Sequence, residues 1–346
     1  MTQHFEVAFT ADFLADGKLV FKDIGLELLS ANQAIRYRFL EPEATLSARQ
    51  LHNLDALVCL APKITIDSLS QADRLVAVAR FGVGYDSVDV NACTEADVAL
   101  FIAAGAVNYS VAEAILGWML ALGHHLKQKD QLVREGRWNE KSHWMGSEIR
   151  HKVVGLVGVG GIGGTLAGLL HPFRAAEIIA FDPYVNAARA QQLMVRLVSL
   201  GELLSLSDYV VICCPLTNET RNLLGAPELA LMKRSAYLVN AARGGIVNED
   251  ALIETLKMKQ IAGAAVDVFA SEPVTARHPL CQFDNVILAP HAIAWTDELF
   301  AEIGQKCCEQ VLSLFSGQVP GGLVNKEVVG RTGFQEKLRR FQQEGS

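Results

Sequence analysis

The feature that most constrains this chain is a glycine-rich turn between an apolar run and a helical stretch. The turn reads Gly158-Val159-Gly160-Gly161-Ile162-Gly163, after the strand-like run Val153–Val157 and before a helix expected over Thr165–Leu170. Glycines at these spacings permit a tight turn and let the backbone approach a pyrophosphate, whose charge a helix N-terminus favours. The pattern predicts a Rossmann-type domain that binds a dinucleotide.

An acid follows at the spacing expected for ribose binding. Asp182 lies 19 positions after Gly163, at the end of the apolar run Glu177–Phe181. A carboxylate there can accept hydrogen bonds from both hydroxyls of the adenosine ribose and repels a 2′-phosphate, so NAD is predicted in preference to NADP. The alternative is a strand-end aspartate that opens a turn before Pro183.

Apolar runs of strand length alternate with helical stretches along the chain, which is typical of parallel sheets built from strand–helix–strand units. The second series has six such runs, the number in a full Rossmann sheet. The runs are Phe5–Phe9, Leu57–Leu60, Leu75–Ala79 and Ala99–Ala103, followed by Val153–Val157, Glu177–Phe181, Tyr209–Cys214, Ala236–Asn240, Ile261–Val268 and Asn285–Leu288.

Two long helices organise the domains. The first is expected over residues 110–135, with Ser110 as N-cap and Glu113 completing a capping box. The second, Thr296–Phe315, is expected to return to the first domain because the second sheet is already complete. The sequence thus predicts a discontinuous substrate domain, an inserted dinucleotide-binding domain and a charged C-terminal tail that is solvated. Their ranges are 1–105 with 296–325, then 106–295, then 326–346. The alternative for the tail is weak docking, because Phe334, Leu338 and Phe341 can line one helical face.

Composition excludes several classes of function. The net charge of −7 gives no basic footprint for nucleic acid or an anionic membrane, and no apolar run approaches the roughly 18 residues that span a bilayer. The N-terminus lacks the cationic region of a secretory signal. The seven cysteines are odd in number and contain no CxxC, which argues against a disulfide framework or a metal site and favours a reducing cytoplasm.

Three charged residues follow strand-like runs downstream of the turn: Arg243, Glu272 and His291. An arginine fork matches a carboxylate and can polarise an adjacent carbonyl. An imidazole can exchange a proton near neutral pH, and a carboxylate beside it orients the ring and favours its protonated form. Alone, Arg243 could be a surface residue of a loop, Glu272 a solvated turn residue, and His291 a helix cap or a core histidine. Together they indicate an anion clamp and a proton relay.

Four stretches, taken in order, resemble the D-isomer-specific 2-hydroxyacid dehydrogenase family over residues 75–323. They are Arg80–Asp86, the Gly158–Gly163 loop with Asp182, Leu231–Gly245, and Ala265–His291. The resemblance implies an α/β chain in which a Rossmann domain is inserted into a flavodoxin-like substrate domain. It also implies NAD-dependent interconversion of a small 2-oxo acid and its D-2-hydroxy acid, usually by a homodimer.

The resemblance also implies roles for individual residues. Arg243 would bind the substrate carboxylate and carbonyl, and His291 would be the acid/base partnered by Glu272. The backbone N–H groups of Val83 and Gly84 would bind the carboxylate, as expected for a glycine-rich anion nest. The expected cofactor contacts, with Asp267 on the nicotinamide side, are Gly158, Gly160, Gly161, Ile162, Gly163, Asp182, Pro215, Thr217, Ala241, Ala242, Asp267 and Ala294.

The chain departs from its relatives at several positions. Gly161 stands where many carry a polar or basic residue, which would remove a pyrophosphate contact, and Cys213 stands where many have histidine and is read as a buried strand cysteine. Two readings stay open for each of three tryptophans. Trp295 either lines the substrate side of the pocket or packs at the domain crossover. Trp138 and Trp144 either reach a neighbouring subunit or pack within their loop.

The sequence leaves a second class of function open, a dinucleotide-sensing binding protein like the transcriptional corepressors that resemble these dehydrogenases. Such proteins can retain the three charged residues. Formate oxidation is disfavoured because related enzymes have an amide where this chain has Glu272, whereas phosphite oxidation shares the trio. Hydroxypyruvate, glyoxylate and longer sugar-derived 2-oxo acids all fit the pattern.

Overall fold

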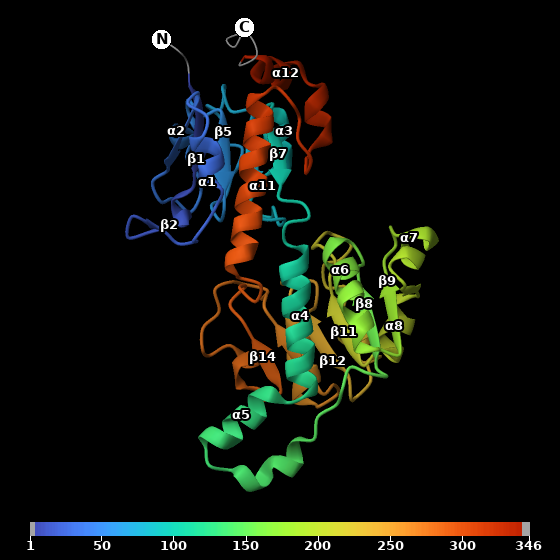
Figure 1. Ribbon diagram of the computed structural model, residues 1–346. Helices are drawn as coiled ribbons and strands as arrows, with labels where there is room; N and C mark the ends of the chain where they lie inside the picture. The colour runs from blue at the N-terminus through green and yellow to red at the C-terminus, as the bar shows by residue number, and fades with distance from the viewer. Residues whose placement is uncertain (1–3, 341–346) are drawn as a thin grey trace. The chain divides into compact units, whose positions relative to one another are not determined.

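The computed structural model describes residues 4–340, and the chain forms two compact units, each built on its own parallel sheet (Figure 1). Unit 1 comprises Met1–Val107 and Trp295–Ser346, and unit 2 comprises Asn108–Ala294. The predicted fold class, a Rossmann domain together with a flavodoxin-like domain, is confirmed.

The sheet of unit 1 has the strand order β4-β1-β5-β6-β7, with all neighbours parallel. This is the flavodoxin order, in which the first strand lies at the point where the order reverses. Its strands are β1 (Phe5–Phe9), β4 (Ile35–Phe39), β5 (Ala56–Cys59), β6 (Ala77–Arg80) and β7 (Ala99–Ile102), and β2 (Leu14–Ala15) and β3 (Lys18–Leu19) form a small antiparallel hairpin.

Strand β4 was not predicted from the sequence, because it lies at the edge of its sheet. Its middle residues, Arg36, Tyr37 and Arg38, are all exposed, so the strand lacks the continuous apolar run of a buried parallel strand. The helices of unit 1 are α1 (Leu26–Ser30), α2 (Ala48–Leu51), α3 (Val90–Glu95), α11 (Asp297–Phe315) and α12 (Thr332–Arg339), with short 3-10 turns η1 (Ala11–Phe13) and η5 (Lys326–Gly330).

The sheet of unit 2 has the order β10-β9-β8-β11-β12-β13-β14, again with parallel neighbours. This is the Rossmann order with a further strand at one edge. Its strands are β8 (Val153–Val157), β9 (Glu177–Phe181), β10 (Arg196–Leu197), β11 (Tyr209–Ile212), β12 (Tyr237–Asn240), β13 (Gly263–Val266) and β14 (Val286–Leu288).

Helices cover both faces of this sheet, and alternate strand residues pack against each face. In β8, Val154 and Leu156 join the core under α4 and α6, whereas Val157 joins the core on the opposite face. Gly155 points to that second face too, where a Cβ would lie 2.2 Å from Ser207 Oγ. The helices are α4 (Asn108–Gly123), α5 (Leu126–Arg134), α6 (Gly161–Leu170), α7 (Ala187–Gln192), α8 (Leu200–Leu206), α9 (Ala226–Leu229) and α10 (Glu249–Lys257), with 3-10 turns η2 (Trp138–Trp144), η3 (His171–Phe173) and η4 (Pro279–Gln282).

The single helix expected over residues 110–135 is wrong. Helix α4 begins at Asn108, so Ser110 and Glu113 lie inside it and do not cap it. The chain then breaks at His125, whose φ of 52° and ψ of 44° place it in the left-handed region, and α5 starts anew. Helix α4 ends at Gly123, two residues before His125, and the His125 ring packs edge-on to Trp144, with the ring centroids 5.6 Å apart. The break thus combines a glycine at the end of α4 with a tertiary contact that the helical pattern does not reveal.

The C-terminal tail was expected to be solvated, and this expectation is wrong for its described part. Phe334 and Leu338 of α12 are buried with Phe101, Leu314 and Val328 in a core of unit 1. Their spacing of four residues places both on one helical face, so the alternative of a docked tail describes this segment. Phe341, the third residue of that expected face, lies outside the described residues. Packing of that face against the sheet of unit 1 holds the segment.

Lys337 is the unusual residue of α12 because its ammonium group is buried. Its Nζ donates hydrogen bonds to the carbonyl oxygens of Ala72 at 3.0 Å and Ala96 at 2.7 Å. Burial lowers the pKa of Lys337 to about 8, although the nearby carboxylates of Asp97 and Asp73 oppose the shift.

This burial predicts an alkaline gain in stability that depends on Lys337. Between pH 8 and about 10.5 the unfolded chain keeps a proton that the folded chain releases, so the free energy of unfolding rises with pH. We compare the free energies of unfolding of the wild type and of Lys337→Met by urea denaturation at pH 7 and pH 10. From pH 7 to pH 10, the wild type should gain stability relative to the variant by on the order of 1–2 kcal/mol. An unchanged difference would contradict the burial of a charged amine.

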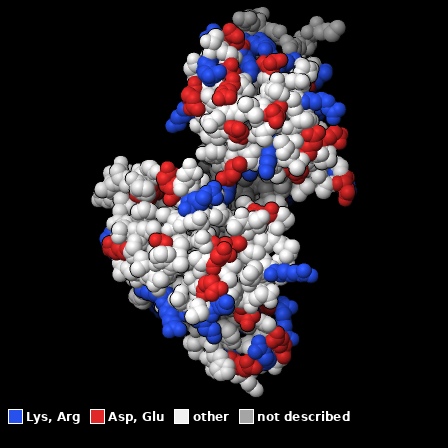
Figure 2. Space-filling view, turned by 180° about the vertical axis from the view of Figure 1, so that it is seen from behind, with Lys and Arg blue, Asp and Glu red and all other residues white. Residues whose placement is uncertain are grey.

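Basic and acidic side chains are interspersed over the face shown in Figure 2. Within residues 4–340, none of the helices combines the length and the apolar character needed to cross a bilayer.

Candidate active site

The glycine-rich turn joins β8 to α6 in a conformation that only glycines allow. Gly158 has a φ of 96°, and a Cβ on it would lie 2.9 Å from the backbone nitrogen of Cys214. A Cβ on Gly163 would lie 2.2 Å from the carbonyl oxygen of Gly158. At Gly160, by contrast, a Cβ would meet nothing within 4 Å, so this part of the turn is open. The turn thus brings bare backbone to an open surface at the start of a helix.

The N–H groups at the start of α6 remain available to a ligand. Among the described residues, no acceptor takes the N–H of Gly160, Gly161 or Ile162. Free N–H groups and the helix dipole together favour an anion at this position. Residues 158–163 therefore fit a dinucleotide pyrophosphate.

Gly161 has a neighbour that sequence reasoning missed. A Cβ on Gly161 would lie 2.6 Å from the side-chain oxygen of Asn108, the first residue of α4. The amide of Asn108 thus fills the space beside the turn where a side chain of residue 161 would begin. No local signal reveals this contact, because the two residues are 53 positions apart.

Asp182 stands at the carboxyl end of β9, next to the turn. Its Oδ2 accepts a hydrogen bond from the backbone N–H of Val159 at 2.9 Å, and its Oδ1 accepts one from the N–H of Tyr184 at 3.0 Å. Asp182 therefore opens the turn after β9, as one of the two readings expects, and it also braces the glycine-rich turn. Its contact with a ribose stays a prediction. Each carboxylate oxygen keeps a second lone pair that a ribose hydroxyl can use.

The turn geometry predicts different effects for two glycines of the same helix. Gly163→Ala places a methyl group against the carbonyl of Gly158, whereas nothing lies within 4 Å of a Cβ on Gly168. We expect Gly163→Ala to weaken NADH binding by roughly tenfold or more, or about 1.4 kcal/mol, in a fluorescence titration. The matched Gly168→Ala variant should bind as the wild type does. Equal affinities for the two variants would show that the turn does not hold the dinucleotide.

The carboxyl ends of three adjacent parallel strands bring the predicted trio to one edge of the sheet. The register pairs Asn240 of β12 with Val266 of β13, and Val266 with Leu288 of β14. Arg243, Glu272 and His291 follow these three strand ends in turn. The loops of Arg243 and Glu272 approach each other closely because residue 244 is a glycine. A Cβ on Gly244 would lie 1.8 Å from the carbonyl oxygen of Phe269.

His291 and Glu272 form a hydrogen-bonded pair. His291 Nδ1 lies 2.8 Å from Glu272 Oε2, and Glu272 Oε1 accepts the backbone N–H of Phe269 at 2.9 Å. The His291 side chain is 46% exposed, so Nε2, which Glu272 leaves unused, can face a ligand. A carboxylate on Nδ1 fixes the ring and its tautomer, which is the arrangement of an acid/base histidine.

Asp267 holds the loop that carries His291. The N–H groups of Ala292 and Ile293 donate to its Oδ1 at 2.9 and 3.2 Å, and the His291 N–H donates to its carbonyl oxygen at 2.8 Å. Burial raises the pKa of Asp267, and the two backbone donors oppose that shift. The structure gives this residue a positioning role; its predicted contact with nicotinamide stays a prediction.

Arg243 is held by its own loop. Its Nη1 donates to the carbonyl of Ala242 at 2.7 Å, while the side chain of Asn240 donates to the carbonyl of Arg243 and accepts from the N–H of Ala242. Ala241, Ala242 and Arg243 are all half-buried at the end of β12. The loop orients a guanidinium at the same sheet edge as the Glu272–His291 pair.

The remaining residues predicted to contact the cofactor also lie at strand ends. Pro215 and Thr217 follow β11 in a turn closed by Thr220, whose hydroxyl donates to the carbonyl of Pro215 at 2.6 Å. Ala294 is buried at the end of unit 2. Cys213, directly after β11, is partly buried, and burial raises the pKa of its thiol to about 12, in keeping with an inert strand cysteine.

Val83 and Gly84 belong to unit 1, in the loop that follows β6. Gly82, just before them, has a φ of 131°. Within residues 4–340, no acceptor takes the backbone N–H of Val83 or Gly84. Two successive free donors in a glycine-rich loop form the kind of nest that binds anions.

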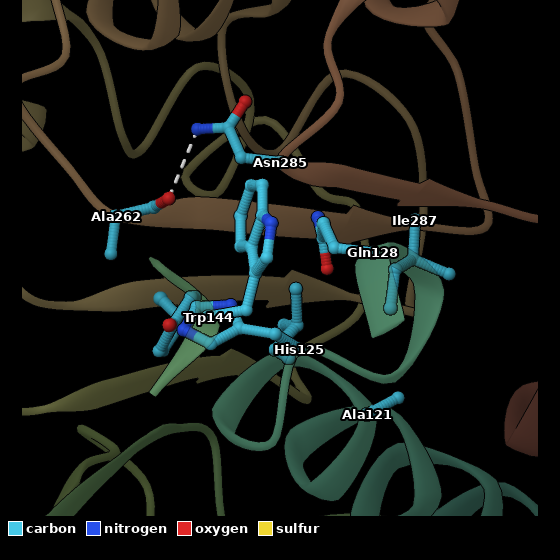
Figure 3. Close-up of a pocket in the computed structure, with 9 residues that line it drawn as sticks. Ala121, His125, Gln128, Trp144, Ala262, Asn285 and Ile287 are labelled. Carbon is cyan, nitrogen blue, oxygen red and sulfur yellow. Dashed lines mark hydrogen bonds between the residues drawn. The ribbon is translucent and has the colours of Figure 1, made fainter. Parts of the chain in front are cut away.

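Unit 2 contains a cavity of about 70 Å³, whose lining residues are shown in Figure 3. It lies at the opposite ends of the strands from the trio. Tyr237 begins β12, and Ala262 and Asn285 immediately precede β13 and β14, so these lining residues mark the amino ends of the strands. Trp144 and His125 also line the cavity. Trp144 therefore packs within its own unit, while Trp138 is 62% exposed and carries Lys141 over its ring at 5.8 Å.

Comparison with known proteins places these features in a family. Residues 116–292 match the model of the NAD binding domain of D-isomer specific 2-hydroxyacid dehydrogenases. The chain is 36% identical over 313 residues to glyoxylate reductase of Aeropyrum pernix, covering 88% of this chain and 93% of that protein. It is 34% identical over 288 residues to D-3-phosphoglycerate dehydrogenase of Archaeoglobus fulgidus, covering 83% of this chain but only 54% of that protein.

The chain thus spans about half the length of the phosphoglycerate dehydrogenases it matches. Among solved structures, the PH0520 protein of Pyrococcus horikoshii is similar over 97% of this chain and 99% of its own, with a TM-score of 0.79 and 26% identity.

Proposed function

We propose that this chain, which belongs to the D-isomer specific 2-hydroxyacid dehydrogenase family, is an NAD-dependent oxidoreductase that interconverts a small 2-oxo acid and its D-2-hydroxy acid. The observation that carries the proposal is the 2.8 Å pair of His291 and Glu272 beside the loop of Arg243, at the carboxyl edge of an NAD-binding domain. Ligands of open parallel sheets bind at this edge.

The cofactor proposed here is NAD, held by the open glycine-rich turn and by Asp182. When bound as NADH it supplies the hydride that reduces the substrate carbonyl. The carboxylate of Asp182, which already accepts a hydrogen bond from the N–H of Val159, would accept hydrogen bonds from the ribose hydroxyls and repel a 2′-phosphate. We therefore propose a preference for NADH over NADPH.

Residues of the chain would bind the substrate and transfer the proton. Arg243, together with the free N–H groups of Val83 and Gly84, would bind the substrate carboxylate and fix the keto carbon for reaction. In reduction, His291 would deliver a proton from Nε2 to the carbonyl oxygen, while Arg243 stabilises the charge developing there. In oxidation, neutral His291 takes the proton back, and Glu272 on Nδ1 stabilises the imidazolium.

The test is NADH oxidation, with NADPH in parallel, against a panel of 2-oxo acids. We expect rapid turnover with NADH on at least one acid and slower turnover with NADPH. His291→Ala should lower turnover by roughly 10²- to 10⁴-fold, the usual contribution of a positioned acid/base, because the proton donor is lost. NADH affinity, measured by fluorescence, serves as the control and should be retained because the glycine-rich turn is intact.

Unaffected turnover in His291→Ala would show that the proton relay is assigned wrongly. Tight NADH binding without turnover on any acid would favour the second candidate, a dinucleotide-sensing binding protein on the same fold. The ordered contacts of His291 with Glu272 and of its loop with Asp267 support the enzyme.

We also propose that the chain acts as a homodimer, joined through residues 126–145 of unit 2. Four large apolar side chains are exposed on this segment: Leu126 (53%), Val133 (61%), Trp138 (62%) and Met145 (79%). Such a concentration of exposed apolar side chains is unusual on the surface of a monomer. The resemblance to dimeric family members supports a second copy of the chain as the partner that covers them.

Light scattering after size exclusion tests the dimer. The wild type should elute as a dimer, and the double variant Val133→Asp with Trp138→Asp should shift toward monomer because it places charges in an apolar interface. Met258→Asp, equally exposed at 63% elsewhere on unit 2, is the control and should stay dimeric. A monomeric wild type would refute the proposal.

We further propose a cytoplasmic location and a small-molecule substrate without a nucleic acid or membrane partner. The seven free cysteines and the net charge of −7 support this.

A further inference from the structure

An aromatic cluster lies at one edge of unit 1. Phe21 stacks on Phe300 with the ring centroids 3.8 Å apart, and Phe13 packs edge-on to Phe81 at 4.8 Å. Phe9 packs edge-on to Phe13, with the ring centroids 5.5 Å apart. The members of this aromatic cluster, all buried except the last, are Phe9, Phe13, Phe21, Phe81, Phe300 and Trp295.

The aromatic cluster stands at the carboxyl edge of the sheet, where parallel sheets bind their ligands. Phe13 ends the 3-10 turn that follows β1, and Phe81 directly follows β6. Phe81 also immediately precedes the loop of Gly82, Val83 and Gly84, whose free N–H groups are proposed above to bind the carboxylate. The cluster therefore adjoins one proposed end of the substrate.

Trp295 is the exposed member of the cluster. Its ring packs edge-on against Phe300 at 5.2 Å and Phe21 at 5.9 Å, yet the residue is 56% exposed. It comes four residues after the proposed proton donor, His291. Two edge contacts fix the orientation of the indole while leaving apolar surface available to a ligand.

Further exposed apolar residues flank the cluster on the hairpin of β2 and β3. Leu19 is 40% exposed and Val20 is 48% exposed, and the Val20 N–H donates to the carbonyl of Phe13 at 2.9 Å. Figure 1 shows β2 and the beginning of α11 at the same end of unit 1. The exposed apolar surface at the aromatic cluster is thus larger than the side chain of Trp295 alone.

The charges around this surface do not suit an anionic substituent. The segments 11–23 and 295–300 contain two lysines and five acids. One lysine, Lys22, already pairs with Asp297 at 3.8 Å. The acids are Asp12, Asp16, Asp23, Asp297 and Glu298. These two segments carry net negative charge, which disfavours a phosphate or second carboxylate on the substrate, and the guanidinium of Arg80, directly before Phe81, already donates to the carbonyl of Phe81.

We propose that the substrate is a 2-oxo acid whose C2 substituent is uncharged and apolar, branched aliphatic or aromatic, and that Trp295 selects it by packing against this substituent. The inference rests on the proposed dehydrogenase function and narrows it. Under this proposal glyoxylate is a poor substrate, because it has no C2 substituent that could pack against Trp295. Phosphorylated acids are also poor substrates, because their negative charge would lie near acidic segments.

The test compares kcat/KM of the full chain with NADH across five acids: glyoxylate, hydroxypyruvate, phosphohydroxypyruvate, 4-methyl-2-oxopentanoate and phenylpyruvate. We expect the last two to exceed the first three by roughly tenfold or more, the effect of burying a few apolar carbons. A preference for glyoxylate, hydroxypyruvate or the phosphorylated acid would overturn the inference and leave the proposed function intact. No NADH oxidation with any acid would instead defeat the proposed function.

Variants of Trp295 test its role separately. Trp295→Ala should lower kcat/KM on phenylpyruvate by roughly tenfold through a higher KM, with little change on glyoxylate. Trp295→Phe keeps an aromatic face and should restore most of the loss. Leu231→Ala, a truncation of a residue that is 49% exposed on unit 2, is the control and should leave the ratio of the two acids unchanged. An unchanged ratio in Trp295→Ala would show that another surface selects the substrate.

Discussion

The parallel register of β12, β13 and β14 is the constraint on which the candidate active site depends. It aligns the carboxyl ends of three strands, so that residues up to 48 positions apart in the sequence, Arg243 and His291, emerge at one edge. Loop contacts then set the fine geometry. Gly244 lets one loop touch the carbonyl of Phe269, and Asp267 fixes the backbone beyond β13 and β14. The 2.8 Å pair of His291 and Glu272 follows from this arrangement.

Much of this could be predicted from the sequence because buried parallel strands have a strong signal. Continuous apolar runs located every strand of the unit 2 sheet except the two-residue β10, and small or charged residues directly after them marked the functional edge. The glycine-rich turn could also be predicted, because two of its glycines, Gly158 and Gly163, lie so close to backbone atoms that a side chain would clash with them.

What the sequence could not predict depends on contacts between distant residues. The exposed edge strand β4 has no apolar run, and at the break after α4 the packing of His125 on Trp144 joins residues 19 positions apart. The burial of Lys337 required the carbonyls of Ala72 and Ala96 to lie beneath α12. In the site, the brace of Asp267 on the His291 loop and the amide of Asn108 beside Gly161 are likewise tertiary.

The most direct test of the central claim is isotope transfer. The protein would be incubated with a 2-oxo acid and NADH deuterated at C4 of the nicotinamide, in each of its two stereochemical forms, and the product analysed by mass spectrometry and chiral chromatography. The account predicts deuterium at C2 of a D-2-hydroxy acid from one of the two forms. Deuterium in no product, although NADH is bound, would contradict the assignment of this edge of unit 2 as a hydride- and proton-transfer site.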